Sequence, residues 1–87
     1  MNAEGLTKYY AEKGITVQIE AGTVGLVVYA STRVDAERVA RDLAGSARAR
    51  DPRARAAPAT KDADEPAATA WWTTVEFDWR KFRWGSR

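Results

Sequence analysis

The chain has 87 residues, with 14 Lys and Arg against 12 Asp and Glu and a formal net charge of +2. Cysteine and histidine are absent, which excludes disulfides and thiolate sites and removes the commonest near-neutral general base and transition-metal ligand. The length predicts a single domain, 1–87, with one small core. No apolar run approaches the roughly 18 residues of a membrane helix, so we expect a cytoplasmic protein that contacts no membrane.

The first predicted element is a short helix over residues 3–13. Leu6, Tyr9 and Tyr10 share one face at the i, i+3, i+4 spacing, and Gly14 follows as a C-terminal stop. A helix this short is marginal in water on its own. We therefore expect it to dock on the core and to use these three side chains for packing.

A β-hairpin is predicted next. Residues 15–20 alternate apolar and polar side chains, which is typical of a half-buried strand. We expect the turn at 21–22, because glycine supplies the positive φ of such turns. The return strand, 23–30, is then apolar on both faces, which indicates a central strand or an outer face covered by a helix or a second subunit. Within it, Gly25 marks a possible bulge or close backbone approach. The inward face is expected to hold Val24, Leu26, Val28 and Ala30.

The main helix is predicted to begin at Thr32. Its hydroxyl can accept a hydrogen bond from an orphan amide, while the carboxylate of Asp35 suits the positive end of a helix. We expect the helix to end between residues 45 and 50, because Pro52 disfavours helical geometry at the residue before it. Its apolar face is Ala36, Val39, Ala40, Leu43, Ala44 and Ala47.

Residues 51–69 are rich in Ala, Pro and charged residues and lack apolar periodicity. We predict a mobile loop of about twenty residues, which is unusual in a small domain. A basic run lies within and just before this loop. Such runs are usually solvated, but this one can also serve as a secondary basic patch that grips phosphate or an acidic protein surface. Its members are Arg48, Arg50, Arg53 and Arg55.

The C-terminal stretch 71–84 carries six of the nine aromatic residues. Its first part alternates, and this predicts a half-buried strand. After Trp79 the parity flips, which indicates a strand end or a bulge around 78–80. The residues beyond interleave cations with aromatics, a pattern that suits phosphate contacts with base stacking but equally a solvated face beside the core edge. The inward set is Trp71, Thr73, Val75, Phe77 and Trp79, and the outward set is Trp72, Thr74, Glu76 and Asp78.

Together these elements predict an α+β domain of order α-β-β-α-β. A three-stranded antiparallel or mixed sheet would have the main helix packed on one face. A last strand beside the first would pair antiparallel, whereas one beside the second would be parallel with a right-handed crossover. The two-sided apolar pattern of 24–30 favours the second arrangement. One sheet face would then be poorly covered, so we expect a homodimer.

These residues suggest three classes of function: an enzyme, a protein-interaction module and a nucleic-acid-binding protein. Glu76 and Asp78 could form a carboxylate pair, but alternating acids on the wet face of a strand usually serve solubility, and no nucleotide or metal motif occurs. We therefore predict no enzyme, no cofactor and no metal. The mild net charge favours a protein-interaction module, such as an accessory, inhibitor or regulatory protein. The alternative is a nucleic-acid-binding protein that uses the basic-aromatic C-terminus and segment 48–55. The predicted partner-binding residues are Tyr29, Trp72, Arg80, Lys81, Arg83 and Trp84.

Overall fold

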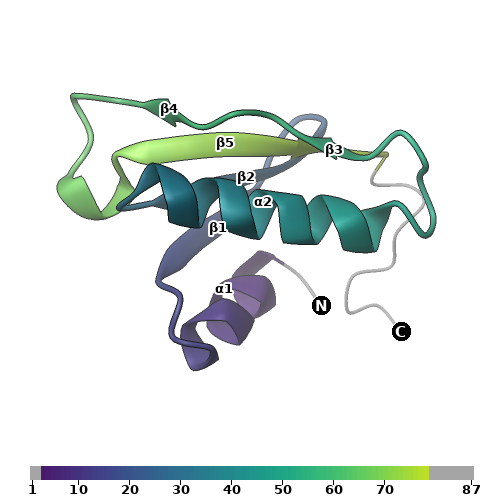
Figure 1. The fold of residues 1–87 in the computed structure, drawn as a ribbon, viewed down its shortest axis with the longest axis horizontal. Helices are drawn as coiled ribbons and strands as arrows, with labels where there is room; N and C mark the ends of the chain where they lie inside the picture. The colour runs from purple at the N-terminus through teal and green to yellow at the C-terminus, as the bar shows by residue number, and fades with distance from the viewer. Residues whose placement is uncertain (1–2, 79–87) are drawn as a thin grey trace.

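A computed structural model describes residues 3–78 of the chain (Figure 1). The described part is an α+β domain with two helices and a five-stranded antiparallel sheet. Its elements in chain order are α1 (Ala3–Glu12), β1 (Val17–Ala21), β2 (Gly25–Ala30), α2 (Arg33–Ala47), β3 (Arg55–Ala56), β4 (Thr60–Lys61), the 3-10 helix η1 (Ala67–Thr69) and β5 (Trp71–Glu76).

The strand order is β1-β2-β5-β3, and the short β4 also pairs with β5. The α+β class is confirmed, but the predicted three-stranded sheet and the order α-β-β-α-β are wrong. The last strand does lie beside β2, yet the two strands are antiparallel, with Ala30 opposite Trp71. A single crossover through α2 would have made them parallel. Here α2 runs back along the sheet and the segment after it returns in the opposite direction, so β5 begins beside the end of β2 (Figure 1).

The segment 51–69, predicted as a loop, contains β3, β4 and η1 and covers the outer edge of β5. Backbone hydrogen bonds hold it there, from Ala57 N to Thr74 O at 3.0 Å and from Asp62 N to Ala70 O at 2.7 Å. The buried Thr73 hydroxyl also donates to Ala57 O. Two-residue strands are too short to show alternation, so the sequence pattern gave no sign of them. The mobility of this segment stays a prediction.

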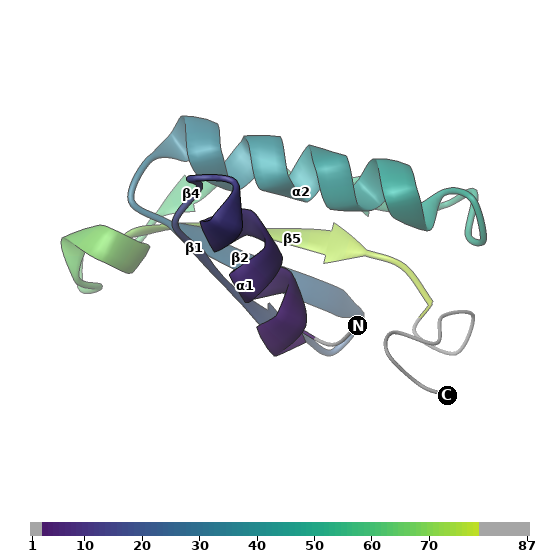
Figure 2. The same ribbon diagram turned by 90° about the horizontal axis from the view of Figure 1, so that it is seen from below.

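Helix α2 agrees closely with expectation. Its N-cap is Thr32, whose Oγ1 accepts a hydrogen bond from Asp35 N at 3.1 Å. The helix ends at Ala47, within the predicted interval. All six residues of the predicted apolar face are buried against the sheet, and α2 lies alongside β5 (Figure 2). Their small side chains allow this close approach, while the strands supply the larger core residues.

Helix α1 buries Leu6 and Tyr10 in the same core, whereas Tyr9 is 39% exposed. The prediction that Tyr9 packs into the core is therefore wrong. Leu6 and Tyr10 are one turn apart and form the centre of the buried stripe, which leaves Tyr9 on its flank. There the Tyr9 ring meets the Tyr10 ring edge-on at 5.2 Å, and Lys13 Nζ lies 4.6 Å from its centroid.

The hairpin turn lies later than predicted. Gly22 N donates to Gly25 O at 2.8 Å, and Val24 is 60% exposed in the turn, so its expected place on the inward face is wrong. Positive φ occurs at Gly25 (+152°), while Gly22 has none. A Cβ at Gly25 would lie 1.9 Å from Val75 O, which confirms the predicted close backbone approach.

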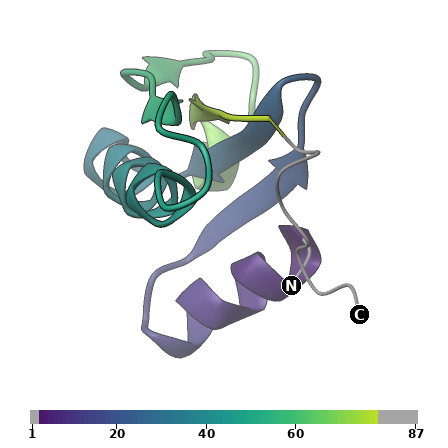
Figure 3. The same cartoon turned by 90° about the vertical axis from the view of Figure 1, so that its right-hand side faces the viewer.

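Both α-helices cover one face of the sheet, and the described residues place no α-helix on the other (Figure 3). Helix α1 also protects the free edge of β1, because Ile19 N donates to Thr7 Oγ1 at 2.9 Å. None of the helices in residues 3–78 is long and apolar enough to span a membrane. We call the face of the sheet opposite α1 and α2 the open face.

Candidate functional site: the open face of the sheet

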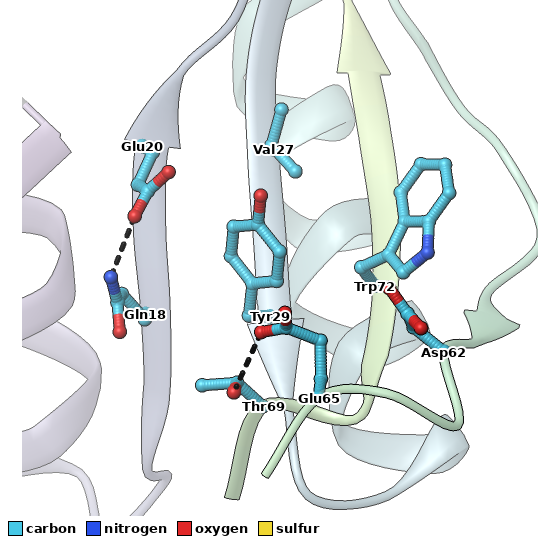
Figure 4. Close-up of a pocket in the computed structure, with 8 residues that line it drawn as sticks. All are labelled: Gln18, Glu20, Val27, Tyr29, Asp62, Glu65, Thr69 and Trp72. Atoms are coloured by element: carbon cyan, nitrogen blue, oxygen red, sulfur yellow. Dashed lines mark hydrogen bonds between the residues drawn. The ribbon is translucent and has the colours of Figure 1, made fainter.

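The open face of the sheet contains a hollow of about 430 Å³ (Figure 4). We call it the aromatic hollow, because Tyr29 of β2 and Trp72 of β5 form its floor. Strand β1 provides one wall, and the turn between β4 and β5 provides the other. The lining residues are Gln18, Glu20, Val27, Tyr29, Asp62, Glu65, Thr69 and Trp72.

The floor is a row of side chains that crosses neighbouring strands. Gln18 stands opposite Tyr29, Tyr29 opposite Trp72, and Trp72 opposite Thr60. Directly opposed side chains on one face of a sheet lie in contact distance of each other. The two aromatic residues, 43 positions apart in the chain, thus occupy neighbouring positions on the open face, and both are only partly buried.

Three carboxylates stand at the rim of the aromatic hollow. Glu20 accepts a hydrogen bond from Gln18 Nε2 at 2.6 Å, Asp62 accepts one from Asp64 N at 3.0 Å, and Glu65 is 3.5 Å from the Thr69 hydroxyl. None of the Lys and Arg residues between 3 and 78 lines the hollow. The ion pairs in this part of the chain involve only Glu37 and Glu76 as acids, so no described cation pairs with the rim carboxylates.

The electrostatics of Tyr29 reflect this rim. Burial raises the pKa of the Tyr29 hydroxyl, and the negative charges of Glu20 and Glu65 raise that pKa further. Both effects disfavour a phenolate. Tyr29 is therefore a neutral ring and a hydrogen-bond donor, in a region of negative potential.

The charges of the chain are divided between its two parts. All twelve acids but only ten of the fourteen cations lie in residues 3–78, which gives that part a net charge of −2. The remaining four cations, a charge of +4, lie in residues 79–87. The overall basicity of the chain thus does not come from the domain that forms the hollow.

Of the predicted partner-binding residues, the structure brings Tyr29 and Trp72 together. Arg80, Lys81, Arg83 and Trp84 lie outside the described residues, as does Trp79. The three rim carboxylates were not among the residues predicted from the sequence. Glu20 shares its parity in β1 with Gln18, so alternation could have placed it on the outer face. Asp62 and Glu65 gave no such signal, because their position depends on how 51–69 folds over β5.

All four arginines of the predicted basic patch are exposed, and two of them have partners within the domain. Arg48 Nε donates to Ala54 O at 2.9 Å, and Arg55 Nε pairs with Glu76 Oε1 at 3.2 Å. Arg50 and Arg53 are exposed. Two of the four guanidinium groups thus have partners within the domain, which limits what the patch can offer to phosphate.

The turn that carries these arginines is organised by Asp51, which is 4% exposed. Its carboxylate accepts hydrogen bonds from Arg53 N at 3.1 Å and Asp78 N at 2.8 Å. Asp51 thereby ties the end of α2 to the end of β5. Its burial and its backbone donors assign it a structural role.

Of the two acids considered as a carboxylate pair, Glu76 is paired with Arg55, and the Asp78 amide donates a hydrogen bond to the Asp51 carboxylate. No group of three or more potential metal ligands occurs within residues 3–78. Comparison with protein-family models, with curated proteins and with solved structures finds no match for this chain.

Proposed function

We propose that this chain is a small non-catalytic protein-interaction module that binds its partner at the aromatic hollow. The observation that carries the proposal is the cross-strand pair of Tyr29 and Trp72 on the open face of the sheet. Tyr and Trp are enriched among the residues that dominate binding energy at interfaces. They are most effective in a recess from which the partner can exclude water.

The sheet edges support face binding over strand addition. At β1 the Ile19 amide already donates to Thr7 Oγ1. At the opposite side, β3 and β4 are two residues each with Pro58 between them, and Arg55 and Lys61 add charge. Short, charged, proline-containing edges are poor templates for another strand. A partner is therefore expected on the face.

A homodimer stays a prediction, and the rim argues against forming it face to face. A twofold interface brings each patch against its own copy. Glu20, Asp62 and Glu65 would then approach the same three carboxylates of the second chain, and like charges repel. We therefore favour a different protein as the occupant. Sedimentation velocity of the full chain checks the homodimer directly.

Nucleic-acid binding is disfavoured at this face for the same reason. Aromatic side chains on a sheet can stack bases, but phosphates would meet a rim of carboxylates, and no cation from the described part of the chain lines the hollow. The alternative through 48–55 and the C-terminus stays a prediction. Titration with mixed DNA and RNA at low ionic strength checks it, since four phosphate contacts predict a salt slope of about −3 to −4. In that case, the triple variant Arg80→Ala, Lys81→Ala, Arg83→Ala would abolish the binding.

The central test of the proposal uses the full chain and two variants. Partners are captured from an extract of the source cells with immobilised wild-type chain and with Trp72→Ala, then purified and measured by calorimetry. A hot-spot residue contributes about 2 kcal/mol or more, so we expect roughly 30-fold weaker binding for Trp72→Ala. Val34→Ala is the control, because Val34 is 68% exposed on α2, away from the hollow.

Circular dichroism of each variant verifies that the fold is intact. The proposal is contradicted if every purified partner binds Trp72→Ala and wild type with equal affinity. Partners that bind at the same strength to all three proteins would also count against the open face, because their site must then lie elsewhere.

A further inference from the structure

We infer that the aromatic hollow receives the cationic side chain of an arginine or lysine carried by an extended segment of the partner protein. This inference rests on the proposed function and specifies the chemistry of the partner. It follows from the rings on the floor, from the carboxylates on the rim and from the lack of a lining cation among the described residues 3–78.

The floor offers the faces of two electron-rich rings. A guanidinium or ammonium group over a Trp or Tyr ring is attracted by the ring's quadrupole, and the attraction grows when water is excluded. Figure 4 shows Tyr29 and Trp72 on the adjacent strands β2 and β5. The molecule already contains one contact of this kind, between Lys13 Nζ and the Tyr9 ring.

The rim supplies the counter-charge. Glu20 approaches from β1, while Asp62 and Glu65 approach from the turn before β5, so carboxylates flank the rings on opposite sides (Figure 4). Hydrogen bonds from Gln18 and from the Asp64 amide orient two of them. These bonds leave further carboxylate lone pairs for a bound donor, because each ionised carboxylate has about four acceptor positions.

The chain does not neutralise this rim from within the described residues. Lys61 directly precedes the rim residue Asp62 in sequence. It stands opposite Trp71, whose side chain lies on the helix-covered face, so Lys61 does not share the open face with the rim. Three carboxylates around one hollow repel each other, and a partner's cation would relieve that repulsion. The raised pKa of Tyr29, caused by burial and then by Glu20 and Glu65, agrees with this negative potential.

The shape of the site favours a side chain on a peptide over a free small cation. The hollow is a shallow recess in a sheet face. A lone amine would leave much of the Tyr29 and Trp72 rings exposed to water. An extended segment that crosses the face can insert one cationic side chain and cover the rings with its neighbours, as interface anchors do.

The test uses the full-length chain and two synthetic probes. One probe is an acetylated, amidated peptide, Gly-Ser-Arg-Ser-Arg-Ser-Gly, and the other is its twin with citrulline in place of both arginines. Citrulline keeps the shape and removes the charge. Calorimetry at low ionic strength is expected to show at least tenfold tighter binding of the arginine peptide. Equal affinity of the two peptides would overturn the inference.

Matched charge variants locate the binding. Glu20→Gln with Glu65→Gln removes two rim charges, and we expect at least tenfold weaker binding of the arginine peptide. Glu4→Gln with Glu12→Gln removes the same charge from the exposed surface of α1 and should change binding less than twofold. An equal loss in both double variants would show a general charge effect and overturn the site. Trp72→Phe, which keeps a ring, should retain more binding than Trp72→Ala.

Two further outcomes separate the possible occupants. Argininamide alone binding as tightly as the peptide would overturn the extended segment. The cation that enters the hollow could instead come from Arg80, Lys81 or Arg83 of a second copy of this chain. If sedimentation velocity shows a dimer that the Glu20→Gln, Glu65→Gln variant no longer forms, the occupant is a second copy and the inference is overturned. If captured partners lose affinity for Trp72→Ala while the citrulline twin binds like the arginine peptide, only the cationic chemistry fails. If Trp72→Ala has no effect on any partner, the proposed function itself fails.

Discussion

The two faces of the sheet are built from alternating residues of the same strands, yet they have different tasks. On the helix-covered face Leu26, Val28 and Val75 are at most 1% exposed. On the open face Tyr29 and Trp72 remain partly exposed beside three carboxylates. Two large aromatic residues, Tyr29 and Trp72, thus lie on the face that contributes less to the core, whereas Phe77 belongs to the core and Trp71 packs against it. This separation predicts that stability and binding respond to different substitutions.

The largest stability effect is expected on the covered face. Leu26→Ala removes a side chain that is 1% exposed and leaves a cavity, so we expect a loss of about 2–5 kcal/mol in the free energy of unfolding. Tyr29→Ala, three residues along the same strand, loses a cross-strand contact that is worth roughly 0.2–1 kcal/mol. Urea denaturation of both variants measures the difference. Equal losses would contradict the division between the faces.

A smaller but clear effect is expected at the contact that joins β2 to β5 and so serves both faces. Gly25→Ala places a Cβ 1.9 Å from Val75 O at a φ of +152°. We expect a loss of roughly 1–3 kcal/mol, because the backbone must shift or adopt a strained conformation. Gly45→Ala is the control, since a Cβ there meets nothing within 4 Å and alanine favours a helix by about 1 kcal/mol. Thermal unfolding of both variants measures the contrast, and a Gly25→Ala variant as stable as wild type would contradict the close approach.

The smallest effect on stability is expected at Glu37, the residue of α2 that binds the segment 51–69 from which Asp62 and Glu65 reach the rim. Glu37 Oε2 accepts a hydrogen bond from Ala59 N at 2.8 Å and pairs with Arg33 at 3.1 Å. The Ala59 amide, and then Arg33, lower the pKa of the Glu37 carboxyl. Because the folded state binds this proton less readily, the stabilisation is complete above the ordinary pKa of a glutamate and is lost as the pH falls through the lowered value.

Glu37→Gln is therefore expected to be slightly less stable than wild type at neutral pH, and the difference should shrink in acid. Melting temperatures measured between pH 7 and pH 3 would show the two curves converge. Glu12→Gln, at the exposed end of α1, is the control. A gap between wild type and Glu37→Gln that stays constant over this range would exclude a contribution from the ionised carboxylate.

The local elements were largely predictable because their signals lie within short stretches. Periodicity in neighbouring residues predicted the six-residue apolar stripe of α2 and the parity of β5. Local capping chemistry predicted the N-cap at Thr32. The same parity placed Trp72 outward, and this identified half of the floor of the hollow. Tyr9 was misplaced because it lies on the flank of the buried stripe of α1, and Val24 because it directly precedes β2, where spacing alone does not decide burial.

The segment 51–69 shows where sequence reasoning fails. Its small residues have no period, and its two short strands exist because β5 offers backbone partners and Glu37 accepts the Ala59 amide. Asp62 and Glu65 reach the hollow only through this path. The antiparallel direction of β5 has the same origin, since the ordered return of the segment reverses the chain once more.

The sequence by itself thus determined the helices, the central hairpin, the alternation of β5 and the outward position of Trp72 and Tyr29. Those properties follow from side-chain period and from backbone preferences of a few residues. The tertiary structure alone decided that Tyr29 and Trp72 are cross-strand neighbours and that three carboxylates surround them. The reason is that pairing between distant strands depends on the whole path of the chain, which no local pattern records.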